Sequence, residues 1–118
     1  MIKIAHRGSI NGNLLDHRGN ETYYKFHENS MLSYENAIQQ KFDMIEADII
    51  LTKDDQLIMF HDIHIGSSLV KNLTYYEIKE RYKYVITFQE FCTDILPRIK
   101  ILLDIKGDNN TALKIIDF

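Results

Sequence analysis

The stretch from Phe42 to Leu51 constrains the fold more than any other part of the chain, because it is apolar apart from three acids. A strand with one face in water alternates apolar and polar residues, whereas a strand buried on both faces is apolar almost throughout. The stretch therefore predicts a strand inside a parallel sheet that helices cover. Two of its acids, Glu46 and Asp48, are two residues apart, so their side chains point to the same face of the sheet.

Shorter apolar runs predict three more strands, over residues 2–5, 57–61 and 99–105. Apolar residues at helical spacing predict helices over 30–41, 73–83 and 87–96. A last helix is expected to begin after Asp108. Ser30 is the expected N-cap of the first helix, and Pro97 ends the third. Strands that alternate with helices favour an α/β fold with a parallel sheet.

Positions 9–28 are polar and carry several Asn, Gly and Asp residues, which predicts a long loop. Loops longer than about 12–15 residues are uncommon in compact domains and often serve a function. This loop contains His17-Arg18-Gly19, which repeats His6-Arg7-Gly8 near the amino terminus. The second copy follows no apolar run, so we assign a function only to the first.

Glu46 and Asp48 indicate a site for a divalent cation. Two carboxylates held together repel each other, unless one takes up a proton or a cation binds between them. Mg²⁺ and Ca²⁺ prefer carboxylate oxygens, and the flanking apolar residues argue against the alternative of two solvated acids at an exposed edge. Asp104 and Lys106 repeat the same spacing on a later strand. They are either a salt bridge or, if their strand lies beside the others, a third metal ligand and a cationic contact for phosphate.

His6 and His61 each end an apolar run. Phosphodiester cleavage needs a base for the attacking hydroxyl and an acid for the departing oxygen, and histidine is the side chain that most often moves protons near neutral pH. A lone histidine at a strand end is more often a surface or core residue, but two that coincide with an acidic pair favour an active site. Arg7 offers a guanidinium fork that matches phosphate oxygens. We interpret His27 and His64 as structural or surface residues.

The composition excludes several other classes of function. The 118 residues are enough for one domain with a core. A net charge of −3 provides no basic surface for nucleic acid, and no run approaches the roughly 20 apolar residues of a membrane span. The single Cys92 can form no disulfide within the chain, and the opening residues do not form a signal peptide. We therefore expect a cytoplasmic protein whose partner is a small molecule.

Five segments along the chain carry a resemblance. They are Ile4-Ala5-His6-Arg7-Gly8, Glu28-Asn29-Ser30, residues 42–55, Leu57-Ile58-Met59-Phe60-His61-Asp62 and Leu102-Leu103-Asp104-Ile105-Lys106. In this order they are similar to the opening motif, the segment before the first helix, and the second, third and fourth strands of the glycerophosphodiester phosphodiesterase family. The joint occurrence of five segments is far more specific than any one of them.

The resemblance implies a TIM-type (β/α)8 barrel and a divalent cation, Mg²⁺ or Ca²⁺. It implies hydrolysis of glycerophosphodiesters to an alcohol and glycerol phosphate. It also implies a role for each matching residue: His6 and His61 as acid and base, Arg7 and Lys106 as phosphate contacts, Glu28 as a supporting or substrate-binding acid, and Glu46, Asp48 and Asp104 as metal ligands. The family usually has Glu where Asp104 stands and Pro where His27 stands.

A closed barrel of this type takes about 250 residues, so residues 1–118 are expected to form a partial domain of four strands, about half a barrel. We expect a fragment or truncated product, or a chain that assembles with another half-barrel through its open sheet edge. Two further functions stay open on the sequence alone. One is a phospholipase D-like lyase that makes a cyclic phosphate, and the other is a catalytically silent remnant or interaction module.

Overall fold

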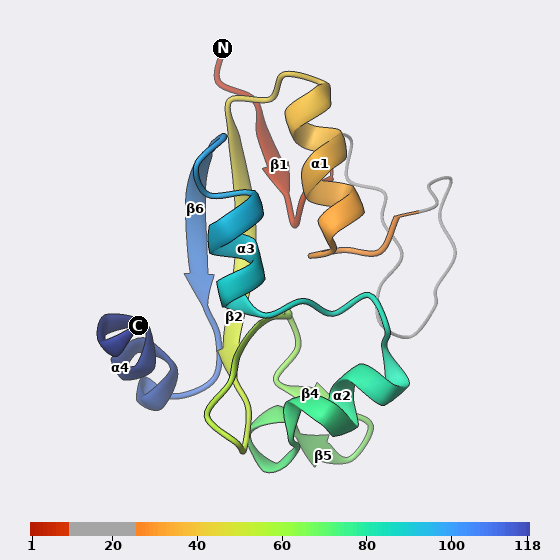
Figure 1. Ribbon diagram of the computed structural model, residues 1–118, viewed down its shortest axis with the longest axis vertical. Coiled ribbons are helices and arrows are strands. Elements are labelled where there is room, and N and C mark those ends of the chain that lie inside the picture. Colours follow the sequence, from red (N-terminus) through yellow and green to blue (C-terminus); the bar gives the residue numbers. More distant parts are fainter. Residues whose placement is uncertain (10–25) are drawn as a thin grey trace.

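The computed structural model describes residues 1–9 and 26–118 (Figure 1). Most of the loop expected over 9–28, with its second His17-Arg18-Gly19 copy, lies outside the described residues. The strands are β1 (Ile4–His6), β2 (Met44–Leu51), β3 (Leu57–Met59), β4 (His64–Ile65), β5 (Ser68–Leu69) and β6 (Lys100–Ile105). The helices are α1 (Met31–Gln39), α2 (Tyr75–Arg81), α3 (Phe88–Asp94) and α4 (Asn109–Asp117), with a short 3-10 helix η1 (Val70–Asn72).

Strand β2 is the centre of a four-stranded sheet. It pairs in parallel with β1 through Met44–Glu46 and with β6 through Met44–Ile49. Its last three residues pair with β3. Ile49 pairs with residues of both β3 and β6, so β3 continues the edge that β1 begins, and β6 lies on the other edge. Among the described residues, no strand pairs with the outer edge of β6, and the sheet is therefore open.

The expected α/β fold with parallel strands is confirmed, but one strand differs from the expectation. The strand predicted over 57–61 ends at Met59 and runs antiparallel to β2. The physical reason is the short connection, which closes through a hydrogen bond from the Thr52 amide to the Gln56 carbonyl. A parallel neighbour would need a crossover of a dozen or more residues.

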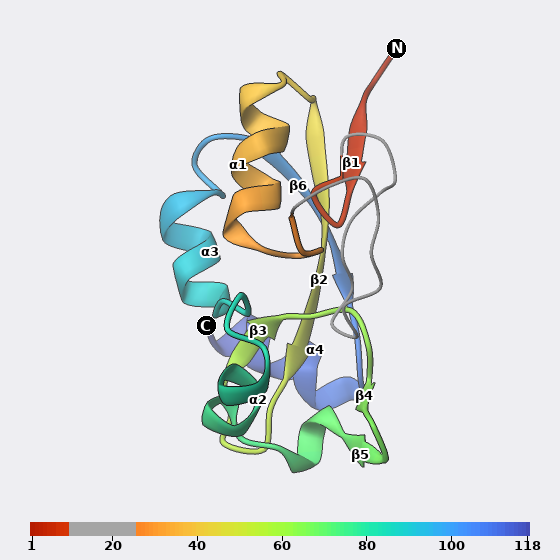
Figure 2. The same cartoon turned by 90° about the vertical axis from the view of Figure 1, so that its right-hand side faces the viewer.

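Helices α1 and α3 cover the same face of the sheet (Figure 2). The side chains of Ile45, Ala47 and Ile49 point to this face, since alternate residues of a strand share a side. They form the main core with these buried residues: Ala5, Tyr34, Ala37, Leu57, Met59, Ile86, Phe88, Phe91 and Ile95. This packing explains why the odd-numbered residues of β2 are apolar. The even-numbered residues of β2 point to the opposite face of the sheet.

The helix starts follow from capping residues. Ser30 caps α1 as expected, and its side chain accepts a hydrogen bond from the Ser33 amide. Thr74 and Thr87 cap α2 and α3, each in a capping box with a glutamate three residues later. Such caps stabilise a helix by about 1 kcal/mol each. None of the helices in the described part of the chain has the length and apolar character of a membrane span.

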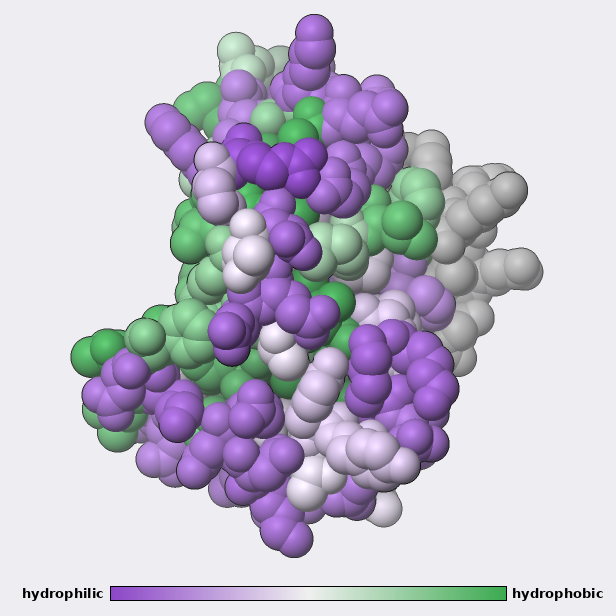
Figure 3. Space-filling model, in the orientation of Figure 1, coloured by the Kyte–Doolittle hydropathy of each residue, from purple (hydrophilic) through white to green (hydrophobic). Residues whose placement is uncertain are grey.

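On the face of the sheet opposite α1 and α3, Ile50 of β2 and Ile58 of β3 pack against Ile78 of α2. Among the described residues, no helix covers the β1 and β6 part of this face (Figure 2). Ile4 and Leu102 point to it, because they are in register with Met44 and Glu46 of β2, and Leu102 is 50% exposed. Helix α4 lies across the end of the sheet and leaves Leu113 and Ile116 exposed. Figure 3 shows hydrophobic surface gathered over α4. This apolar exposure marks surfaces that are suited to contact further protein.

Gly8 determines how β1 ends against α1. Its φ is +88°, and a Cβ atom added there would lie 2.5 Å from the Ser33 hydroxyl oxygen and 3.1 Å from the Ser33 carbonyl carbon. Real Cβ atoms do not approach so closely, so β1 can turn beside the first turn of α1 only with glycine at this position. Gly66, in the turn between β4 and β5, has φ +61° but open space around it.

We expect Gly8→Ala to destabilise the chain by more than Gly66→Ala. The control substitution costs the left-handed backbone strain alone, about 1–2 kcal/mol, whereas Gly8→Ala adds the collision with Ser33. Urea unfolding of the two variants, followed by circular dichroism, measures the difference. Equal losses of unfolding free energy would contradict this account of the turn.

Candidate active site

The turn after β1 places Arg7 at the centre of the site. Arg7 has φ 55°, in the left-handed region, and Gly8 follows with φ 88°. Hydrogen bonds from the Gly8 amide to the Ala5 carbonyl and from the Ser9 amide to the His6 carbonyl close the turn. The Arg7 amide donates to Oε1 of Glu46 at 3.2 Å. The backbone is thus held on to the acidic strand β2.

The guanidinium of Arg7 collects side chains from three separate segments. Nη1 lies 3.2 Å from Oε1 of Glu28, and Nη2 lies 2.8 Å from Nε2 of His61. Nε lies 3.8 Å from Oδ2 of Asp48. The segment before α1, strand β2 and the segment after β3 therefore meet at one cation.

His61 is oriented by its neighbour. Because an arginine N–H can only donate, Nε2 of His61 accepts the hydrogen bond from Arg7. The ring proton is then on Nδ1, which lies 2.5 Å from Oδ1 of Asp62 and donates to it. Asp62 fixes the tautomer and leaves Nε2 directed at the site. Sequence reasoning did not assign a role to Asp62, although its position beside His61 was the available signal.

Three carboxylates converge on the face of the sheet opposite α1 and α3. The parallel register sets Asp48 beside Asp104, and Glu46 precedes Asp48 by one full alternation. Ligand oxygens of Glu46, Asp48 and Asp104 lie within 4.8 Å of one another. A hard cation takes oxygen ligands at 2.0–2.6 Å, so one ion can reach all three.

The surroundings of Asp48 fit this donor set. Its side chain is fully buried, and Oδ1 has no hydrogen-bond partner among the described residues. Such an oxygen is costly to bury without a partner, and a cation would satisfy it. Lys106 limits the negative charge from the other side, with Nζ 2.9 Å from Oδ2 of Asp104 and 3.8 Å from Oδ1 of Asp48. The salt bridge and the third carboxylate foreseen for Asp104 and Lys106 are therefore compatible.

The electrostatics of the cluster change the proton affinity of its members. Burial, followed by the negative charge of Asp48, raises the pKa of Glu46 above its usual value. Burial also raises the pKa of Glu28, although the Arg7 charge opposes this. The pKa of His6 is lowered, first by partial burial and then by the charge of Arg7. Glu46 and Glu28 thus resist ionisation, and the His6 imidazole stays neutral to lower pH than an exposed histidine.

All eight residues selected from the sequence belong to this one region. His6 is in register with Glu46 on the same face, and the others are joined by the contacts described above. Glu46 and Asp48 lie within β2, as the run from Phe42 to Leu51 predicted. Asn29, quoted in a motif but given no role, is fully buried and bonded to Asp48.

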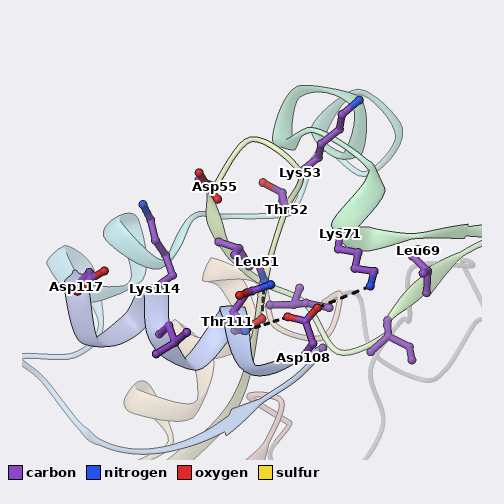
Figure 4. A pocket seen from close by; sticks show the side chains of 15 residues that line it. Leu51, Thr52, Lys53, Asp55, Leu69, Lys71, Asp108, Thr111, Lys114 and Asp117 are labelled. Atoms are coloured by element: carbon purple, nitrogen blue, oxygen red, sulfur yellow. Dashed lines mark hydrogen bonds and ion pairs between the residues drawn. The ribbon is translucent and has the colours of Figure 1, made fainter.

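A cavity of about 560 Å³ lies elsewhere, between the start of α4, the turn after β2 and the segment around Lys71 (Figure 4). Asp108 and Lys71 form an ion pair of 3.7 Å beside it. None of the eight candidate residues lines this cavity. The carboxylates and Arg7 instead lie on the face of the sheet opposite α1 and α3.

Glu46→Gln is expected to stabilise the chain in cation-free buffer near pH 7. Because the pKa of Glu46 is raised in the folded state, the fold loses stability as pH rises through that pKa. Glutamine keeps the oxygen that accepts from the Arg7 amide and removes the charge. The stability gain should be absent near pH 4 and grow toward pH 7, as measured by urea unfolding with chelator present.

Glu80→Gln, on an exposed part of α2, is the control and should change the unfolding free energy by less than about 0.5 kcal/mol at either pH. A Glu46→Gln variant that is no more stable at pH 7 would contradict the raised pKa of Glu46.

Comparisons with known proteins agree with this geometry. The family model described as the glycerophosphoryl diester phosphodiesterase family matches residues 17–115. An uncharacterized protein of Mycoplasma genitalium is 31% identical over 121 residues, which cover 86% of this chain and 48% of that protein. A mouse lysophospholipase D is 28% identical over 132 residues, which cover 94% of this chain and 38% of the relative.

Solved structures show the same fold. A glycerophosphodiester phosphodiesterase of Thermotoga maritima matches with a TM-score of 0.75 at 19% identity, over 99% of this chain and 49% of that one. An Oleispira antarctica phosphodiesterase in complex with the product sn-glycerol-3-phosphate matches with a TM-score of 0.72 at 22% identity, again over 99% and 49%. The chain spans about half the length of these relatives. The family match over most of the chain, together with the likeness in fold, means that this chain belongs to the glycerophosphoryl diester phosphodiesterase family.

Proposed function

We propose that the chain supplies the catalytic half of a barrel that hydrolyses glycerophosphodiesters to an alcohol and glycerol phosphate. The observation that carries the proposal is the convergence at Arg7 of Glu28, Asp48 and His61, from three segments of the chain. A structural ion pair needs two partners, whereas this group places one cation among several titratable side chains on an open face. Perturbed titratable groups that gather in this way are typical of functional sites.

Binding of the substrate phosphate is assigned to Arg7 and Lys106. Both cations border the carboxylate cluster, at 3.8 Å from opposite oxygens of Asp48. Arg7 can meet two phosphate oxygens with its fork, and Lys106 can meet a third as a point charge. Glu28, which bonds Nη1 of Arg7, holds the guanidinium in place for this contact.

Glu46, Asp48 and Asp104 would hold the divalent cation, Mg²⁺ or Ca²⁺. When bound, such an ion supplies Lewis-acid stabilisation of the charge on the phosphoryl group. The three side chains also relieve their own repulsion by sharing it, which is consistent with the raised pKa of Glu46. Asp104 has one methylene fewer than the glutamate usual in the family. Its ligand oxygen nevertheless lies within 4.8 Å of those of Glu46 and Asp48, which is close enough to share one cation.

His6 and His61 are proposed to move the protons. The lowered pKa of His6 keeps its imidazole neutral near pH 7, which suits acceptance of a proton from the attacking water. When Arg7 turns to the phosphate and releases Nε2, His61, backed by Asp62 at Nδ1, can take up a proton on Nε2 and deliver it to the departing alcohol oxygen. The Asp62 carboxylate stabilises the charged ring during that transfer.

The direct test is phosphorus NMR of a glycerophosphodiester, sn-glycero-3-phosphocholine, incubated with the chain and Mg²⁺. Appearance of glycerol phosphate supports hydrolysis, and a cyclic phosphate as end product supports the lyase. No conversion, by a chain that binds Mg²⁺, supports a silent remnant. Two relatives, a phosphodiesterase in complex with its product sn-glycerol-3-phosphate and a lysophospholipase D, favour glycerol phosphate or a lipid-derived product.

In the active form, His6→Ala and His61→Ala should each lower turnover by about 10²–10⁴-fold, the usual contribution of general acid–base help. Affinity for Mg²⁺, measured by isothermal titration, should stay unchanged because neither side chain is assigned as a ligand. His64→Ala is the matched control, since His64 is exposed on β4, and it should keep full turnover. Unchanged turnover in both active-site variants would refute the acid–base assignment, and a parallel loss of Mg²⁺ affinity would reassign the histidines as ligands.

The open face is proposed to associate with a second copy of the chain. The outer edge of β6 is unpaired among the described residues, and Leu102 exposes apolar surface beside it. An unpaired edge with apolar neighbours favours pairing with another chain.

Sedimentation velocity should therefore show a dimer that forms with rising concentration. Leu102→Lys should weaken it by placing a charge in the contact. Tyr76→Lys, at a more exposed apolar site on α2, should not weaken it. A monomer at all concentrations would contradict self-association and favour the catalytically silent alternative.

A further inference from the structure

Asn29 makes a set of hydrogen bonds that none of the roles assigned so far explains. Its amide nitrogen Nδ2 donates to Oδ2 of Asp48 at 3.0 Å. Its oxygen Oδ1 accepts from the Asp48 amide at 3.2 Å and from the Tyr34 hydroxyl at 2.7 Å. We infer that Asn29, held by Tyr34, is a positioning residue that turns the Asp48 carboxylate so that Oδ1 faces the divalent cation. The inference rests on the proposed function of the acidic cluster.

The orientation of the Asn29 amide is fixed by chemistry. A backbone N–H can only donate, so the atom that faces the Asp48 amide must be the side-chain oxygen. The NH₂ group then has to face Oδ2 of Asp48. One oxygen of the carboxylate is thereby engaged by the protein, while Oδ1 is left buried without a hydrogen-bond partner. Asn29 thus binds Oδ2 of Asp48 and leaves Oδ1 available to the cation.

Tyr34 and the backbone hold Asn29 in this orientation. Tyr34 lies on α1 and is completely buried, with its ring edge against Phe91 at 5.1 Å between centroids. Burial raises the pKa of the Tyr34 hydroxyl well above its usual value, so the group stays a neutral donor. The backbone amide of Asn29 donates to the Arg7 carbonyl at 2.9 Å. The backbone of Asn29 has φ 52°, which asparagine tolerates better than most residues. Asn29 therefore contacts both Arg7 and Asp48 and sets the distance between them.

The test compares affinities for Mg²⁺ and Ca²⁺ by isothermal titration of the chain. Asn29→Gly removes the amide while it permits the left-handed backbone, and Tyr34→Phe removes a single hydroxyl. We expect Asn29→Gly to weaken cation binding by about 10–100-fold, the usual effect of removing a group that orients a ligand. Tyr34→Phe should weaken it in the same direction by a smaller factor.

Thr111→Val is the matched control. Thr111 is as buried as Asn29 and also bonds the backbone of β2, through the Leu51 amide at 3.3 Å, but it lies away from the carboxylates. It should lower the unfolding temperature without changing cation affinity, which separates positioning from a general loss of stability.

Wild-type affinity in both Asn29→Gly and Tyr34→Phe would overturn the inference alone. A wild-type chain that binds neither cation would overturn the metal site and the inference together. Cation binding without hydrolysis would count only against the proposed activity.

Discussion

The structure depends on how it tolerates acids on a buried strand. Glu46 and Asp48 share the central strand β2, and Asp104 is in register with Asp48. Carboxylates this close cannot all ionise without compensation. Arg7 and Lys106 provide part of it from two sides of Asp48, each at 3.8 Å. Burial, followed by the negative charge of Asp48, still raises the pKa of Glu46.

The elements around the site hold the groups that neutralise the charge of these carboxylates. The Arg7-Gly8 turn needs a left-handed backbone and a missing side chain, so that β1 can end against α1. The same turn directs the Arg7 amide to Glu46 and its guanidinium to Asp48. Helix α1 contributes Tyr34 and the preceding Asn29, which fix the other side of Asp48. Stability and site geometry are thus determined by the same few contacts.

An open sheet is a consequence of the same architecture. Parallel strands need covered faces and paired edges, yet β6 presents an unpaired edge among the described residues and Leu102 stays half exposed. Relatives of about twice the length match this chain over only half of their own residues. On this open sheet the Asp104 side chain remains solvent-accessible, whereas the Asp48 side chain is buried.

The sequence determined the central strand, because a run as apolar as Phe42–Leu51 has to be buried, and alternation placed Glu46 and Asp48 on one face. Helix α1 was likewise predictable from Ser30. The position of His6 and Arg7 at the end of β1 was predictable because they follow an apolar run. All of these are local properties of the chain.

Tertiary structure alone decided the rest. The reversed direction of β3 depends on a five-residue turn, and the hydrogen bonds of Asn29 join residues 19 positions apart. Local sequence carries no information on such distant partners, since a buried asparagine and a loop asparagine look alike until the strands are packed.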